Sequence, residues 1–527
     1  MDQDASHSRT VSHPGRLLLL LVFAGGFSSI GTELAASRLV APYFGSSTFI
    51  WATLIGLTMT FLAVGYWLGG KVADSHPSAS LLYGVTAGAA LAIAAVPLIS
   101  RPILRLSLDA FATVDVGAFY GSLVGSIFML AIPITLLGFV TPFAIRLSVS
   151  DVDTAGNTSG SIYALSTVGS IAGSFLPVLL FIPLWGTTWT FIALSLVLLV
   201  PSLLGLLSQR RAGIAAIALL ALLGVILGVR TLGTTAIRPA ERGTMLDERE
   251  SAYNYLQVTD QDGARLLIMN EGHAIHSIYH PETLLTGGPW DYFMLAPLVV
   301  DQFSPDTVDN ALIIGLAGGT AARQLAEAYP GIAITGVEID PVVADLGMEW
   351  FGMGDIPNLT VEIADGRYAL TTSSETFDLI AVDAYRQPYI PFHLTTREFF
   401  DDVSQHLSPT GVAVVNVGRT ETDYRLVDAI ASTMTASFDH VFAVDVGRYM
   451  NTLVIGTNAD ASIEAFASNG TARSDTAILS QVAAWAASDG NLRGVAPGTT
   501  VFTDDHAPVE LVIDQIILDA ARELTTR

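Results

Sequence analysis

Long apolar runs fill the first 230 residues of the chain. Seven such runs occur, at 17–36, 48–70, 79–99, 119–145, 161–184, 187–208 and 212–229. A helix needs about 20 apolar residues to cross the hydrocarbon core of a bilayer, which is ~30 Å thick. One run alone would also suit a buried core helix, but seven predict a multi-pass α-helical membrane domain over residues 1–230. Because further runs follow at once, the first is not expected to be a cleaved signal peptide.

Glycine recurs at helical spacing inside these runs. Gly65, Gly69 and Gly70 lie in the second run, and Gly169 and Gly173 lie four residues apart in the fifth. Small residues let helix backbones approach closely where no hydrophobic effect drives association. We therefore expect these glycines at helix–helix contacts rather than at a ligand.

One carboxylate, Glu33, lies inside the first apolar segment, five residues before Arg38. A charge there is costly unless it is paired or hydrated. Glu33 therefore predicts either an intramembrane polar site or an ion pair with Arg38.

The pattern changes after Arg242, where shorter apolar segments alternate with polar ones. Tyr253–Thr259 alternates like a strand, and Arg265–Met269 is its expected hairpin partner. These two strands predict a small β subdomain at about residues 245–280. A βαβ pattern follows, consisting of a strand at Ala311–Gly315, a helix at Thr320–Tyr329 and a strand at Ile332–Val337. Such a pattern is typical of a doubly wound, Rossmann-like α/β sheet, expected over about residues 300–460.

A glycine-rich loop, Gly315-Leu-Ala317-Gly318-Gly319, ends the first strand of this unit. Glu338 stands 23 residues after Gly315, at the carboxyl end of the second strand. Glycines let a ligand approach the backbone, and a carboxylate at that strand end can accept hydrogen bonds from both ribose hydroxyls. No lysine follows the loop, so it is not a phosphate-binding loop of the Walker type. The arrangement predicts a nucleoside ligand.

Two further carboxylates end the next two strands. Asp365, followed by Gly366, ends the third strand, and Asp383 ends the fourth. Ligands of open parallel sheets lie beyond the carboxyl ends of the strands, near the switch in strand order. We expect Glu338, Asp365 and Asp383 to converge on one crevice there. Asp365 could alternatively cap the helix that follows it.

Composition and charge exclude several classes of protein. The chain has no cysteine, which removes disulfides, thiolate metal sites and cysteine nucleophiles. Residues 231–527 hold 15 Arg, no Lys and 41 Asp or Glu, which argues against a nucleic-acid partner. His273, His276 and His280 lie in a region of strand and turn with no completing carboxylates, so no metal is expected.

At these residues the chain resembles the spermidine synthase (polyamine aminopropyltransferase) family, in its membrane-fused form. The resemblance covers nearly the whole chain. It is carried by 41–45, 65–74 and 160–169 in the first half, and by the glycine loop, 337–340, 364–366, the strand ending at Asp383, and 391–398 in the second. The motif at 503–510 also resembles one near the end of the membrane-fused relatives.

The resemblance implies roles for individual residues. Asp383 would accept the proton of an amine substrate, with Tyr385 close to that substrate. Glu338 would hold the ribose and Asp365 the adenine of decarboxylated S-adenosylmethionine. Further roles follow for His276 beside the nucleoside, Tyr292 in the amine channel, and Asp505 and Glu510 closing the pocket over the amine. The loop residues Gly315, Ala317 and Gly318, with Gly366, would also contact the donor.

The chain departs from the family pattern at three places. Gly318 stands where the family carries an aspartate close to the position of a donor carboxylate, so selection against ordinary S-adenosylmethionine is weakened. The second aspartate after the catalytic one is missing, and Arg386 lies nearby. Phe293-Met294 replaces the family's His-Glu after the channel tyrosine.

The resemblance implies an aminopropyltransferase in residues 231–527, tethered to a membrane, that acts on an amine such as putrescine and releases methylthioadenosine. The alternatives are an S-adenosylmethionine-dependent transferase on a membrane-borne acceptor, and a non-catalytic nucleoside- or polyamine-binding transporter or sensor. The expected partners are the amine and the lipid bilayer, with a homodimer left open. The basic residues flanking the runs divide six against six, so charge leaves the orientation open. Because such nucleosides are made in the cytosol, we expect the soluble domain inside the cell.

Overall fold

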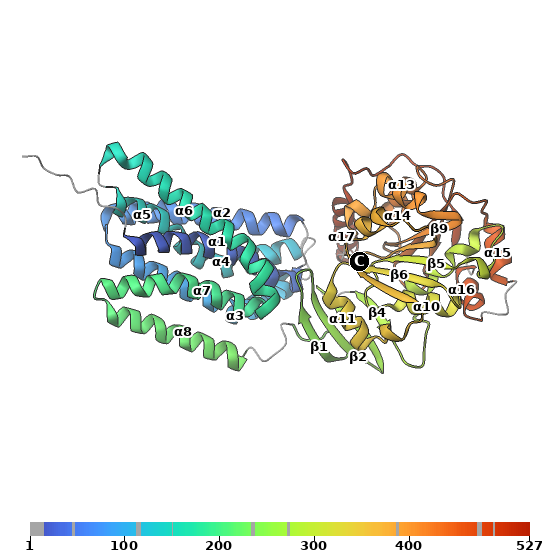
Figure 1. Cartoon of the computed structure of the whole chain (residues 1–527), viewed down its shortest axis with the longest axis horizontal. Coiled ribbons are helices and arrows are strands. Elements are labelled where there is room, and N and C mark those ends of the chain that lie inside the picture. The colour runs from blue at the N-terminus through green and yellow to red at the C-terminus, as the bar shows by residue number, and fades with distance from the viewer. Residues whose placement is uncertain are drawn as a thin grey trace, which may run out of the picture. The chain divides into compact units, whose positions relative to one another are not determined.

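The computed structural model divides the chain into two compact units, Met1–Pro239 and Ala240–Arg527 (Figure 1). It describes residues 15–44, 48–111, 117–149, 151–232, 238–270, 274–385, 389–471, 477–487 and 491–526. The predicted His273 and Arg386 lie outside the described residues.

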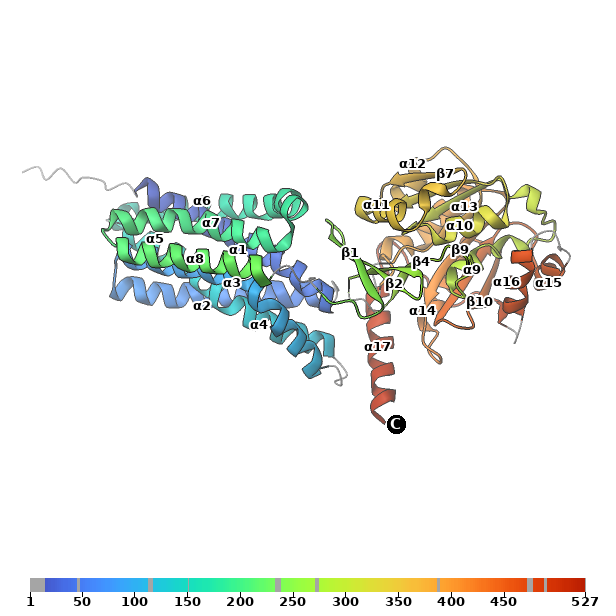
Figure 2. The same cartoon turned by 90° about the horizontal axis from the view of Figure 1, so that it is seen from below.

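The first unit is built from helices that run side by side (Figures 1 and 2). They are α1 (Arg16–Phe44), α2 (Thr48–Ser75), α3 (Ala79–Phe111), α4 (Gly117–Gly138), α5 (Val140–Ser148), α6 (Ala155–Leu176), α7 (Ile182–Ser208) and α8 (Ala212–Leu232), with a π-helical segment at Pro177–Phe181 between α6 and α7. Their buried faces form one apolar core, whereas large apolar side chains remain exposed on the outside of the bundle.

Six helical runs within the described residues are long and apolar enough to cross a membrane, where seven were predicted. The difference arises at Val152–Ser208, which contains two of the predicted runs in one continuous stretch. Gly186 interrupts this stretch with a backbone φ of 75° and ψ of 169°. The chain therefore bends there without a loop, and the two predicted helices join end to end.

Glycine brings the helix backbones of this unit close together. A Cβ atom on Gly169 or Gly173 of α6 would lie 2.2 Å from the Phe23 or Phe27 carbonyl oxygen of α1, respectively. Such distances exclude any side chain and confirm the predicted small-residue face.

The second predicted glycine group is only partly at a close contact. A Cβ on Gly65 of α2 would lie 2.2 Å from the Thr135 carbonyl oxygen of α4, and one on Gly69 would lie 2.7 Å from the Phe139 Cα atom. The nearest atom to a Cβ on Gly70 is 4.0 Å away, so the prediction was wrong for that residue.

The second unit begins with a four-stranded antiparallel sheet. Its strands are β1 (Thr244–Glu250), β2 (Tyr255–Gln261), β3 (Ala264–Met269) and β4 (Ile275–Tyr279), in the order β1-β2-β3-β4. β2 and β3 are the predicted hairpin. Apolar side chains of these two strands pack on α11 (Pro341–Trp350) of the larger domain, which fixes the small sheet against it.

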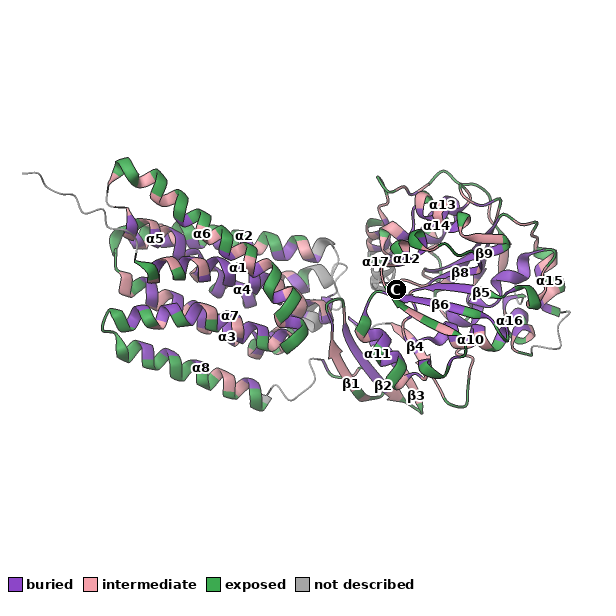
Figure 3. Cartoon of the chain, viewed as in Figure 1, coloured by how far each residue is buried: buried purple, intermediate pink, exposed green. Residues whose placement is uncertain are grey.

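The larger domain is an eight-stranded sheet with helices on both faces (Figures 1 and 3). The strands are β5 (Asn310–Ile314), β6 (Ala333–Glu338), β7 (Leu359–Ile363), β8 (Phe377–Val382), β9 (Leu407–Gly418), β10 (His440–Asp445), β11 (Asn451–Thr457) and β12 (Leu492–Gly494), in the order β12-β10-β11-β9-β8-β5-β6-β7. Those from β9 to β7 run parallel, and β11, β10 and β12 extend the sheet antiparallel.

Two apolar cores lie on the two faces of this sheet. The helices besides α11 are α9 (Pro289–Phe293), α10 (Thr320–Ala328), α12 (Gly366–Thr372), α13 (Arg397–Gln405), α14 (Arg425–Met434), α15 (Ile463–Thr471), α16 (Ala477–Ala487) and α17 (Val509–Thr526). From β5 the chain builds outward through β6 and β7, then returns to the other side of β5 with β8. The switch in strand order therefore lies between β5 and β8, where a ligand crevice is expected.

Candidate functional site

A cavity of about 290 Å³ opens at the carboxyl ends of β5, β6 and β8. Its wall includes the three carboxylates predicted to converge, namely Glu338, Asp365 and Asp383. The other lining residues come from the glycine loop, from 391–394 and from the small sheet, and they include Gly315, Ala317, Gly366, Tyr385, His393 and His276. The volume and the mixture of apolar walls with a few polar groups suit a small-molecule ligand.

The glycine loop turns tightly beneath this cavity. Gly315 has a φ of 90°, and a Cβ on it would lie 2.5 Å from the Asp383 carbonyl oxygen. A Cβ on Gly366 would lie 2.2 Å from the Ile314 side chain, so neither residue tolerates a side chain. Both glycines thus allow the ends of β5 and β8 and the start of α12 to meet at the cavity.

Gly318 packs against Ser277 and Phe351 and does not line the cavity. Its backbone N–H donates to the Ser277 hydroxyl at 2.8 Å. A Cβ atom at this position would lie 3.0 Å from both the Phe351 ring and the Ser277 side chain. An aspartate here would require both to move, which gives a packing reason for the departure from the family pattern.

Glu338 presents its carboxylate to the cavity from the end of β6. It is only 8% exposed, and its Oε2 and Oε1 atoms accept hydrogen bonds from the backbone N–H groups of Ala317 (2.9 Å) and Asp340 (3.1 Å). Burial raises the pKa of Glu338 to about 7, the nearby Asp340 charge adds to this rise, and the backbone donors oppose it. Each oxygen accepts only one of these bonds, so both keep capacity for hydroxyl donors.

Asp383 lies at the end of β8 between two side-chain donors. Trp290 Nε1 donates to one carboxylate oxygen at 3.0 Å, and Asn416 Nδ2 donates to the other at 2.8 Å. Asn451 Nδ2 in turn donates to Asn416 Oδ1 at 2.9 Å, which fixes the orientation of the Asn416 amide. Burial raises the pKa of Asp383 to about 7, although both donors favour its ionised form. Such a group can take up a proton near neutral pH.

Tyr385 lines the cavity with its ring while its hydroxyl is engaged elsewhere. The hydroxyl donates to the Asn416 carbonyl oxygen at 2.9 Å and accepts from the Gly418 N–H at 2.8 Å. Burial and the nearby Asp383 charge raise the pKa of Tyr385 above its usual value. This phenol therefore anchors the segment after β8 to β9, and its predicted contact with the substrate stays a prediction.

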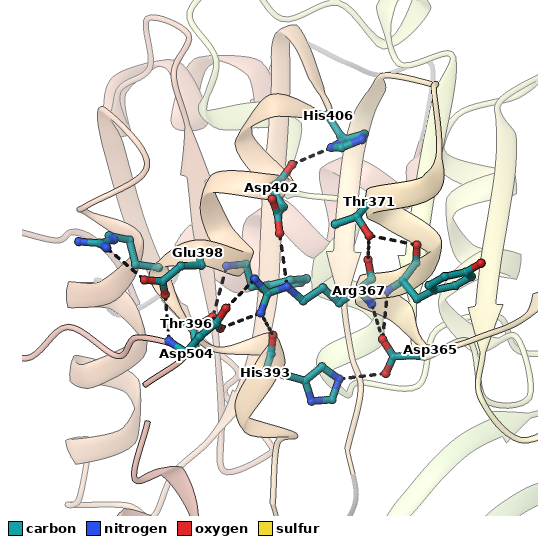
Figure 4. A network of polar contacts seen from close by, with 12 residues as sticks. Asp365, Arg367, Thr371, His393, Thr396, Glu398, Asp402, His406 and Asp504 are labelled. Atoms are coloured by element: carbon teal, nitrogen blue, oxygen red, sulfur yellow. Dashed lines mark hydrogen bonds and ion pairs between the residues drawn. The ribbon is translucent and has the colours of Figure 1, made fainter. Parts of the chain in front are cut away.

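Asp365 caps α12, as one of the two hypotheses predicted, and it also borders the cavity. Its Oδ1 accepts from the backbone N–H groups of Arg367 (3.0 Å) and Tyr368 (3.1 Å), which caps α12. Its Oδ2 contacts His393 Nε2 at 2.9 Å, and both side chains border the cavity. Figure 4 shows how Arg367 continues this network through a 2.7 Å ion pair to Asp504. Asp365 is thus held rigidly at the cavity edge.

Four predicted site residues are not among those that line the cavity, namely Gly318, Tyr292, Asp505 and Glu510. Tyr292 is 4% exposed, and its hydroxyl bonds to the Gly447 backbone within the core. Asp505 is exposed in the turn between Thr503 and His506, and Glu510 lies in the first turn of α17. Sequence spacing does not reveal these positions, because each depends on how its segment packs in the fold.

Several residues of the site were missed from sequence. Trp290, Asn416 and Asn451 hold Asp383, and Asn416 is the one polar residue in the run Val412–Val417, a signal that could have found it. Asp514 of α17, which does not line the cavity, was not singled out from sequence either. It accepts from the Tyr389 hydroxyl at 2.6 Å, while burial and the charge of Glu510 raise its pKa.

No group of metal-ligating side chains is found in the described part of the chain. His276 and His280 are among the described residues, and His273 is not. The expectation of a metal-free site therefore stays a prediction.

Comparison with known proteins identifies the family. Residues 297–461 match the model of the spermine/spermidine synthase domain. A probable polyamine aminopropyl transferase from Bifidobacterium longum is 35% identical over 298 residues, which cover 52% of this chain and 64% of the relative, slightly under two thirds of its length. A polyamine aminopropyltransferase from Vibrio vulnificus is 30% identical over 221 residues, covering 41% of this chain and 72% of the relative.

The similarity also extends into the helical unit. A polyamine aminopropyltransferase from Mycobacterium tuberculosis is 27% identical over 432 residues, covering 76% of this chain and 77% of the relative. An alignment of that length is longer than the unit Ala240–Arg527 and must include residues of the first unit. The chain belongs to the spermine/spermidine synthase family, whose members named here are polyamine aminopropyltransferases.

Proposed function

We propose that the chain is a membrane-anchored aminopropyltransferase that moves an aminopropyl group from decarboxylated S-adenosylmethionine to an amine such as putrescine. The observation that carries this proposal is the convergence of Glu338, Asp365 and Asp383 on one cavity at the strand switch point. The family membership supports the reaction type.

The donor's adenosine would fill the part of the cavity near β6. Glu338 retains hydrogen-bonding capacity for the two ribose hydroxyls, and its burial makes such bonds strong. Asp365 and His393 border the cavity where an adenine amino group would find an acceptor. The positively charged sulfur is favoured by the carboxylates around it.

Transfer requires a neutral amine. Asp383 takes a proton from the substrate ammonium, and the freed nitrogen lone pair attacks the aminopropyl carbon bonded to sulfur. The carbon–sulfur bond breaks, its electron pair stays on sulfur, and methylthioadenosine leaves. A carboxyl with a pKa of about 7 suits this proton transfer near neutral pH, and holding both reactants in line supplies much of the rate.

The far ammonium of a diamine needs its own acceptor, because the family's second aspartate is missing. Asp514 and Glu510 lie one turn apart on α17, and Asp514 contacts Tyr389, which packs in the same apolar core as Tyr385. This acidic pair does not line the cavity itself, and we propose that it receives the far ammonium of a diamine that extends beyond the cavity. A hydrogen bond from an ammonium to a carboxylate is stronger than one between neutral groups.

The six apolar helical runs support a membrane location. We place the C-terminal domain on the cytosolic side, because the donor nucleoside is made in the cytosol. The chain has no cysteine, so a single introduced cysteine reports sidedness cleanly. Asp345 is exposed on α11, and we expect Asp345→Cys to react with a membrane-impermeant maleimide only after cells are permeabilised. Labelling of intact cells would place the domain outside.

A second candidate follows from Gly318. The loop lacks the acidic group that would repel a donor carboxylate, so ordinary S-adenosylmethionine is not rejected by charge there. The chain would then be a transferase acting on a membrane-borne acceptor.

Turnover with each donor separates these functions. Full-length protein is incubated with putrescine and either decarboxylated or ordinary S-adenosylmethionine, and products are identified by mass spectrometry. Methylthioadenosine and an aminopropylated amine in equal amounts are expected. S-adenosylhomocysteine with membrane lipid present would favour the second candidate. Binding of a donor without turnover would instead indicate a transporter or sensor.

A further inference from the structure

The helical unit contains a buried carboxylate that the proposed transferase chemistry does not use. Glu33 lies within α1 and is only 6% exposed. Its Oε2 atom is fully enclosed and accepts no hydrogen bond from any residue that the structure describes. A buried carboxylate oxygen in that state lacks the compensation that buried polar groups normally have.

Two buried hydroxyl groups lie near this carboxylate, that of Thr58 by contact and that of Ser29 by helical spacing. Thr58 of α2 is fully buried, and its hydroxyl lies beside Glu33 without a well-formed hydrogen bond to it. Ser29, one helical turn before Glu33 on α1, has a hydroxyl that is likewise enclosed without a partner among the described residues. Residues four apart share one face of a helix, so Ser29 and Glu33 lie one above the other.

No counter-charge within the described residues offsets Glu33. The ion pair with Arg38 suggested by the sequence is not among the contacts of Glu33, and Arg38 is engaged in another interaction. An ionised carboxylate in apolar surroundings is strongly disfavoured unless a cation or several donors accompany it.

We propose that Glu33, with the hydroxyls of Thr58 and Ser29, forms a binding site for a monovalent cation inside the helical bundle. Carboxylate and hydroxyl oxygens are suitable ligands both for an alkali ion and for a primary alkylammonium, which needs several acceptors for its N–H groups. The site stands on the geometry of the first unit and does not depend on the transferase proposal.

Equilibrium binding to the full-length protein in lipid nanodiscs tests this site. The probes are ²²Na⁺ and ¹⁴C-methylammonium, each with N-methyl-D-glucamine holding the ionic strength constant. The test variant is Glu33→Gln, which keeps the shape and removes the charge. The matched control is Asp74→Asn, because Asp74 is an exposed carboxylate of the same unit that pairs with Arg146. Thermal melting confirms that each variant is folded.

We expect about one equivalent of at least one probe per chain, with at least ten-fold weaker binding in Glu33→Gln and no change in Asp74→Asn. Binding of ²²Na⁺ alone assigns an alkali site, and binding of methylammonium alone assigns an alkylammonium site. No binding of either probe overturns the proposal, as does equal binding by Glu33→Gln. Methylammonium binding that is lost in Asp383→Asn and kept in Glu33→Gln would belong to the transferase cavity and would also overturn it. If Glu33→Gln melts early, Thr58→Val, which keeps size and removes the hydroxyl, is expected to weaken binding, and unchanged binding there contradicts the site.

Discussion

Replacing Asp383 with asparagine tests the proton acceptor with little change in shape. In the native site each carboxylate oxygen accepts one N–H donor, from Trp290 and from Asn416. The asparagine must turn its NH₂ group toward one of these donors. The Asn416 amide cannot simply flip to accept it, because its oxygen already accepts from Asn451.

The expected effect has two parts. One buried donor is left unsatisfied, which costs about 1–3 kcal/mol of stability, partly offset because a buried ionisable carboxyl is removed. Loss of the proton acceptor is expected to lower kcat by about 10²–10⁴-fold, or about 3–5 kcal/mol in the barrier. Donor affinity should stay within about three-fold of wild type, because Glu338 and Asp365 are untouched.

Single-turnover kinetics with decarboxylated donor and putrescine measure the loss, and calorimetry measures donor affinity on the same preparation. Asp345→Asn is the matched control, since Asp345 is an exposed carboxylate on α11. Turnover by Asp383→Asn within three-fold of wild type would refute the assignment. A parallel loss of turnover and donor binding would instead show that Asp383 holds the donor.

Four further outcomes are expected. Glu338→Gln should weaken donor binding about 10- to 100-fold with kcat little changed at saturation, because a hydrogen bond to a charged group is worth about 1.5–3 kcal/mol; unchanged affinity by calorimetry would exclude the ribose contact. Asp514→Asn should raise the KM for putrescine about ten-fold, through loss of a charge-assisted bond, and leave the donor KM unchanged; a KM unchanged for both would remove the acidic pair from the amine site. Folding raises the pKa of Asp383 from 3.8 to about 7, so the stability that this carboxyl contributes is present below pH 3.8 and is lost as the pH rises to about 7. The melting temperature of the wild-type protein should therefore fall over this pH range, and Asp383→Asn should make that fall shallower. An equally steep fall in the variant would contradict the raised pKa. Gly173→Ala should lower the stability of the protein by about 1–3 kcal/mol, because the new Cβ would clash with the α1 backbone. Gly224→Ala is the control, because Gly224 lies in a helix with open space around it and alanine there should raise the stability slightly. Equal melting temperatures of the two variants would contradict the close packing of α6 on α1.

Local patterns predicted most elements of the two units. The apolar runs and the alternating strands depend on residues close in sequence, so β2, β3, β5 and β6 appear where the periodicity places them. Periodicity does not register a bend without a loop, which is why two predicted runs joined at Gly186. Small-residue spacing found the α1–α6 contact at Gly169 and Gly173 but also included Gly70, because spacing alone does not tell which glycine faces a neighbouring backbone.

The cavity was predictable as far as the backbone topology determines it. Glu338 and Asp383 meet because parallel strands end at the same edge of the sheet. Asn451 and Asn416 contact each other because β11 pairs with β9, and this pairing is not readable from spacing. Tyr292 was carried over from the family pattern, and the packing of α9 places it in the core instead of at the cavity.

Binding of decarboxylated S-adenosylmethionine to the Asp383→Asn protein tests the central claim most directly, because this variant should bind the donor without consuming it. Isothermal titration calorimetry is expected to show about one equivalent bound per chain, and much weaker binding once Glu338→Gln is added. Absence of binding heat, with methylthioadenosine equally inert, would mean that the carboxylates at the strand ends do not form an adenosyl-sulfonium site.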